Sequence, residues 1–100
     1  MLNGGSVASN RLFTIIFEFG GLTSATQVVS VDECAAVNKW VDALLSGEHY
    51  GLRLSDAQDL MASFDPSEPA VAIKGLKNVW CCAIGPTGKL GILNIVETVN

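Results

Sequence analysis

The stretch that decides the fold is Leu12–Phe19, which reads LFTIIFEF and is followed by Gly20-Gly21 and a second strand-like run. Successive side chains of a β-strand point to opposite faces of a sheet. Three of the chain's four phenylalanines therefore share one face of this strand: Phe13, Phe17 and Phe19. Leu12 and Ile16 fall on the opposite face, where a two-layer protein usually places polar residues. The sequence thus raises the question of what covers that second face.

Two successive glycines suit a two-residue hairpin turn, which requires positive φ angles. Pairing the chain across Gly20-Gly21 places Phe17 opposite Ser24 on the phenylalanine face. The other face is mixed rather than polar. Its apolar residues that need cover are Leu12, Ile16, Ala25 and Val29. We take these four residues, together with Trp80 from the C-terminal part of the chain, as candidates for an interaction surface.

Composition points to one folded domain with an unusually uncharged surface. The chain has 100 residues, 49% of them hydrophobic and only 16% charged, against roughly 25% charged residues in typical soluble domains. We expect residues 1–10, rich in Gly, Ser and Asn, to be a flexible leader, and residues 11–100 to form a single domain. So few charges favour burial of part of the surface in an oligomer.

The charge balance narrows the classes of partner. Six basic residues face ten acidic ones, for a net charge of −4, whereas nucleic-acid binding relies on clustered Lys and Arg. We therefore expect no nucleic-acid partner, and a basic protein is the better electrostatic match. No apolar run approaches the roughly 18 residues of a membrane span. An odd set of three cysteines, with Cys81 and Cys82 adjacent, favours reduced thiols and a cytoplasmic location.

Two helices are expected in the middle of the chain. Ser30 and Glu33 have the spacing of a capping box, which predicts a helix start at Ser30. The apolar stripe of this helix repeats every three or four residues: Cys34, Val37, Trp40, Val41, Leu44 and Leu45. A second helix is expected to begin at Ser55 and to end before Pro66.

The last third of the chain again predicts strands. Val79–Ile84 and Lys89–Val99 flank a turn signal and predict a hairpin with Ile84 opposite Lys89, while 70–73 is a candidate short edge strand. Both faces of this hairpin are apolar. The sum is an α+β fold in ββααββ order, with an antiparallel sheet of about four strands and two helices packed on one face.

No catalytic, cofactor-binding or metal-binding motif stands out. His49 is the single histidine and lies in a loop, but the sequence does not place a thiol near it. The adjacent Cys81 and Cys82 lack the spacing of a zinc site. We therefore assign no catalytic residue, cofactor or metal.

The leading hypothesis is a non-enzymatic protein–protein interaction domain, a homodimer joined through the face or the edge of its sheet. The alternative is a small-molecule-binding protein or small enzyme, with a site between sheet and helices near His49. That site would be lined by some of these residues: His49, Tyr50, Trp80, Cys81 and Cys82.

Overall fold

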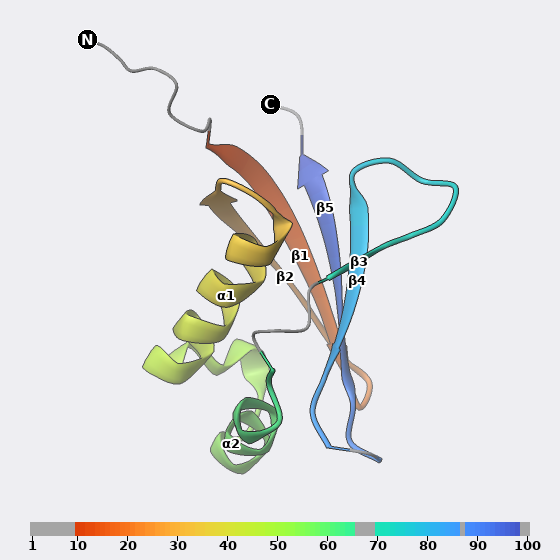
Figure 1. Ribbon diagram of the computed structural model, residues 1–100. Coiled ribbons are helices and arrows are strands. Elements are labelled where there is room, and N and C mark those ends of the chain that lie inside the picture. Colours follow the sequence, from red (N-terminus) through yellow and green to blue (C-terminus); the bar gives the residue numbers. More distant parts are fainter. Residues whose placement is uncertain (1–9, 66–69, 87, 99–100) are drawn as a thin grey trace, which may run out of the picture.

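The protein is an antiparallel five-stranded sheet with both helices on one side of it (Figure 1). The computed structural model describes residues 10–65, 70–86 and 88–98, without the side chains of Glu48 and His49. Most of the expected leader, residues 1–9, lies outside the described residues. The strands are β1 (Arg11–Phe19), β2 (Leu22–Ser30), β3 (Val71–Ala72), β4 (Val79–Ile84) and β5 (Gly91–Thr98), and the helices are α1 (Glu33–Ala43) and α2 (Leu54–Ala62). The α+β class and the one-sided helices agree with the sequence-based expectation, and the element order agrees apart from one added strand.

The first hairpin has the predicted register. Phe17 pairs with Ser24 and Ile16 with Ala25, and both turn glycines have positive φ, 53° for Gly20 and 86° for Gly21. On β1, burial alternates along the strand, and the fully buried side chains are Phe13, Ile15 and Phe17. The phenylalanine face is therefore the core face.

The C-terminal part differs from expectation in strand number and register. The sheet has five strands rather than about four, because the candidate edge strand within 70–73 is present, with Val71 and Ala72 paired with β4 as β3. Ile84 pairs with Gly91 instead of Lys89, because the connection between β4 and β5 is two residues longer than the four-residue turn expected from the sequence. The shift is an even number of residues, so every side chain keeps its predicted face.

The two hairpins join through their first and last strands, in the order β2-β1-β5-β4-β3. β1 pairs antiparallel with β5, with Ile15 opposite Ile95 and Phe17 opposite Leu93. The two most deeply covered strands are thus the ones farthest apart in sequence. The core forms where they meet the helices.

Trp40 on α1 is the centre of that core. Its ring is fully buried, 4.9 Å from the ring of Phe17 and stacked on Tyr50 at 4.6 Å. From α2, Leu60 is fully buried and Ala57 nearly so. The helices therefore close one face of the sheet with apolar side chains.

The helix ends differ in detail from the sequence-based prediction. α1 begins at Glu33 with Asp32 as its N-cap, whose carboxylate accepts a hydrogen bond from the Ala35 amide at 2.8 Å. Ser30 is not the cap, because it is still paired with Arg11 in the sheet. α2 begins at Leu54, preceded by Arg53 without a side-chain cap, rather than at Ser55.

Beyond Ala43 the helix widens into a π-helical turn, η1 (Leu44–Glu48), followed by a short 3-10 turn, η2 (His49–Gly51). Leu45 was expected on the buried stripe but is 63% exposed. Helical backbone geometry breaks at Gly47, whose φ is 107°, so the buried stripe of α1 ends with Leu44, which is 1% exposed.

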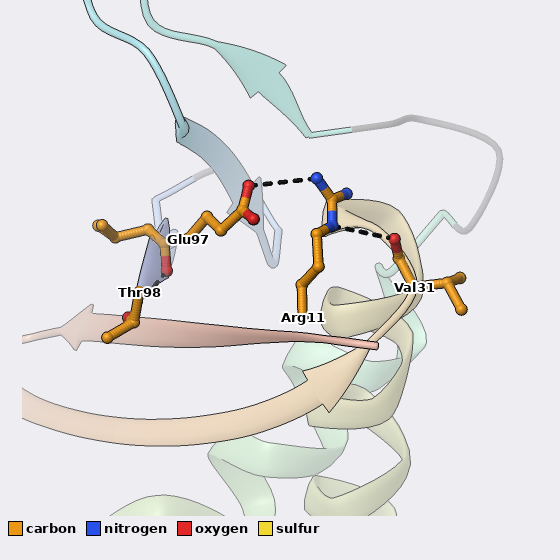
Figure 2. A network of polar contacts seen from close by, with 5 residues as sticks. Arg11, Val31, Glu97 and Thr98 are labelled. Carbon is orange, nitrogen blue, oxygen red and sulfur yellow. Dashed lines mark hydrogen bonds and ion pairs between the residues drawn. The ribbon is translucent and has the colours of Figure 1, made fainter. Parts of the chain in front are cut away.

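Arg11, at the start of β1, makes polar contacts with two other parts of the fold (Figure 2). The Arg11 guanidinium donates to the Val31 carbonyl and to the Glu97 carboxylate, each at 3.2 Å. It also lies over the Phe13 ring, 5.2 Å from its centroid. Arg11 therefore ties β1 both to β5 and to the connection between β2 and α1.

Candidate interaction surface

The sheet face opposite the helices carries no helix from the described part of the chain, and we call it the open face (Figure 1). The register places these side chains on it: Leu12, Thr14, Ile16 and Glu18 of β1; Thr23, Ala25, Gln27 and Val29 of β2; Ile92, Asn94, Val96 and Thr98 of β5; Val79, Cys81 and Ala83 of β4; and Val71 of β3. Most of these residues are apolar, and Glu18 is the single charged residue among them. Within residues 10–65, 70–86 and 88–98, no helix or strand packs on the second face that the sequence left unexplained.

Four of the five residues chosen from the sequence lie together on this face. Leu12 pairs with Val29, and Ile16 pairs with Ala25. Val29 is 49% exposed and Ala25 is also exposed, while Leu12 and Ile16 are half-buried. The exposed members of the group are therefore the two on β2.

The fifth chosen residue, Trp80, lies on the opposite side of the sheet. It pairs with Ile95, whose side chain is in the core, and its ring meets that of Phe13 edge-on at 6.0 Å. Trp80 thus packs against the core beside the helices. The structure does not bring it together with the other four.

A polar row divides the open face. The sequence placed Thr14 opposite Gln27 on this face, but it did not predict that the row continues to Thr98 on β5. Gln27 Nε2 donates to Thr14 Oγ1 at 3.1 Å, and Thr14 Oγ1 lies 2.5 Å from Thr98 Oγ1. These side chains separate the Leu12–Val29 pair from the Ile16–Ala25 pair. The signal that was missing is the contact between β1 and β5, since no local pattern placed Thr98 beside Thr14.

Strand β2 forms one edge of the sheet, with β1 as its single neighbour among the described strands. Antiparallel pairs alternate between those that exchange main-chain hydrogen bonds and those that do not. With Phe19 and Leu22 flanking the turn as a bonded pair, every second residue of β2 directs its N–H and C=O away from β1. The outward-facing residues are Thr23, Ala25, Gln27 and Val29. They are also the open-face residues of this strand.

This edge lacks the usual protection. Natural edge strands are commonly short or carry charges or proline, but β2 has nine residues, LTSATQVVS, with none of these. The ammonium group of Lys39 on α1 donates to the Val29 carbonyl. That contact occupies one end of the edge, and among the described residues no main-chain group pairs with the outward side of Thr23, Ala25 or Gln27.

Ser24 adds a further feature to β2. Its hydroxyl oxygen is buried and finds no hydrogen-bond partner among the described residues. A buried polar group without a partner costs free energy, about 1–3 kcal/mol. Ser24 faces the helix side, opposite Phe17, so this unpaired hydroxyl lies where the core meets the sheet edge.

Two hollows in the described part of the chain bear on the alternative of a small-molecule site. The larger, about 420 Å3, is an apolar groove between the end of α1 and α2, lined mainly by leucine, alanine and methionine side chains. The smaller, about 170 Å3, includes Cys81 and Cys82 beside the end of α2, below the roughly 300 Å3 of typical ligand pockets. Tyr50 and Trp80 line neither of them, and the side chain of His49 lies outside the described residues.

Within residues 10–65, 70–86 and 88–98, no helix is both long and apolar enough to cross a bilayer. Over the same ranges, no three His, Cys, Asp or Glu residues gather in a way that could hold a metal ion. No protein-family model, curated protein or solved structure matches this chain.

Proposed function

We propose that this protein is a non-enzymatic protein–protein interaction domain that self-associates through its sheet as a homodimer. The observation that carries the proposal is the coincidence on β2 of an unprotected strand edge with two exposed apolar side chains, Ala25 and Val29. An exposed, long and uncharged edge is a template for pairing with another chain. Association would remove this edge from solvent.

Composition supports the same proposal. Only 16% of the residues are charged, and the open face contributes a single one of them, Glu18. The core of a protein–protein interface is typically depleted of charged residues. A surface of this kind therefore loses little charge hydration when it is buried.

We further propose a reducing compartment such as the cytoplasm. Cys81 and Cys82 project from opposite faces of β4, which disfavours a disulfide between them. The net charge of −4 favours a basic protein as any additional partner, because opposite charge steers encounter.

Sedimentation equilibrium of the purified chain tests the proposal. We expect the weight-average mass to rise with concentration from that of one 10.5 kDa chain to twice that value. A mass that stays at one chain up to about 100 μM, far above a micromolar Kd, would contradict self-association.

A further inference from the structure

We propose that β2 pairs antiparallel with β2 of a second copy, so that the two sheets join edge to edge into one continuous sheet. The inference rests on the proposed self-association and names the surface and register that produce it. A second copy suits this edge because β2 carries no charge. Two such strands therefore meet without like-charge repulsion.

The main chain favours one register. A two-fold axis at Ala25 sets Ala25 opposite itself and Thr23 opposite Gln27 of the second copy. All three residues direct their N–H and C=O outward, so each pair exchanges two main-chain hydrogen bonds. The ladder then stops before Val29, whose carbonyl already accepts from Lys39. The register uses the free outward groups and leaves the Lys39 contact intact.

Side chains on the helix side favour the same register. Leu22 lies opposite Val28 of the second copy, which matches two half-buried apolar residues. Ser24 lies opposite Thr26 of the second copy. Directly opposed side chains of an antiparallel pair have Cβ atoms about 5 Å apart, and Ser–Thr hydrogen bonds are common there. The hydroxyl of Ser24, unpaired in the single chain, thereby gains a partner.

Each neighbouring register loses part of this match. Moving the strands so that Ala25 opposes Gln27 places Ser24 opposite Val28, which offers no hydrogen bond. The same move draws Val29 into the ladder and displaces Lys39. Moving the other way sets Ser24 opposite Ser24 of the second copy, which keeps a hydroxyl partner for it. That register is disfavoured because Leu22 then lies opposite the hydroxyl of Thr26 and the turn residue Gly21 enters the ladder.

Stacking of two open faces is the competing arrangement. It would bury the row formed by Gln27, Thr14 and Thr98 between two apolar surfaces. The remaining donors and acceptors of these side chains would then lose water without new partners, which is unfavourable. Edge pairing leaves this row at the solvent.

Disulfide trapping tests the register. In the proposed dimer, Ala25→Cys places two cysteines opposite each other with Cα atoms about 5.5 Å apart, within the range that a disulfide spans. Thr23→Cys is the matched control on the same edge, because its two copies lie four residues out of register, about 13 Å apart. Peptide mapping by mass spectrometry assigns each disulfide, so the native cysteines remain in place.

We expect mild oxidation to convert most of the Ala25→Cys protein to a dimer linked through position 25, with at least tenfold less linkage for Thr23→Cys. Equal linkage of both variants, or none for Ala25→Cys, would overturn the edge register. If the unmodified chain sediments as a dimer in that case, self-association stands and only the edge pairing fails. If the unmodified chain is monomeric, the proposed function itself fails.

Discussion

Ile15 and Ile16 are adjacent residues of the same type on one central strand, yet they lie in different surroundings. Ile15 is fully buried beneath the helices, opposite Thr26 and Ile95. Ile16 is half-buried on the open face, opposite Ala25 and Asn94. The comparison separates two roles of the sheet. Its covered face stabilises the fold, whereas in the described part of the chain no helix packs on its open face and no strand pairs with the outer edge of β2.

The largest expected effect comes from truncating these two isoleucines. Ile15→Ala leaves a cavity in the core and should lower the free energy of unfolding by about 2–5 kcal/mol. Ile16→Ala should cost less than half as much, because its side chain already contacts solvent. Urea denaturation below the dimer Kd measures both without a contribution from association. Equal losses for the two variants would mean that something covers the open face of the isolated chain.

A smaller effect is expected from overfilling the covered face. A Cβ at Gly91 would come within 2.6 Å of the ring of Phe17, which is fully buried. Gly91→Ala should therefore lower the free energy of unfolding by about 1–3 kcal/mol. Ala83→Val enlarges an exposed residue on the open face of β4 and serves as the control, with an expected change within about 0.5 kcal/mol. Thermal denaturation of both variants measures the two losses of stability. An unchanged stability of Gly91→Ala would show that the ring of Phe17 can move aside.

The smallest effect on folding is expected at Ser24, where the covered face meets the edge. Ser24→Ala removes a buried hydroxyl that has no partner in the single chain, so the free energy of unfolding of the monomer should rise by about 1 kcal/mol. In the proposed dimer the same change deletes two symmetric hydrogen bonds to Thr26, and the Kd should rise about tenfold. Chemical denaturation measures the free energy of unfolding of the monomer, and sedimentation measures the Kd of the dimer. An unchanged Kd would remove the side-chain argument for the register.

The sequence predicted best those elements whose contacts join residues close together in the chain. Gly20-Gly21 and the alternation of Phe13 and Phe17 determined the first hairpin residue by residue, because turn geometry sets register. The second hairpin lacked an equally short turn, and its register was wrong by two residues. Ser30 fitted a helix cap by spacing alone, but pairing with Arg11 keeps it in the sheet.

The candidate surface was likewise predicted correctly only within a single hairpin. Leu12, Ile16, Ala25 and Val29 were placed together correctly because all four belong to one hairpin. Trp80 was grouped with them although it lies on the other face. The error arose because the side on which the second hairpin meets the first depends on the contact between β1 and β5. No local spacing encodes that contact.

The contact between β1 and β5 also has a consequence for the time course of folding. Arg11 and Glu97 meet although 86 residues separate them, whereas β1 and β2 are joined by only two glycines. Long-range pairing of this kind is slow to form. During synthesis on a ribosome, the first hairpin can therefore close long before β5 is made, with both of its edges unpaired. We expect the nascent chain to depend on chaperones during that interval, since unpaired strand edges are prone to aggregate.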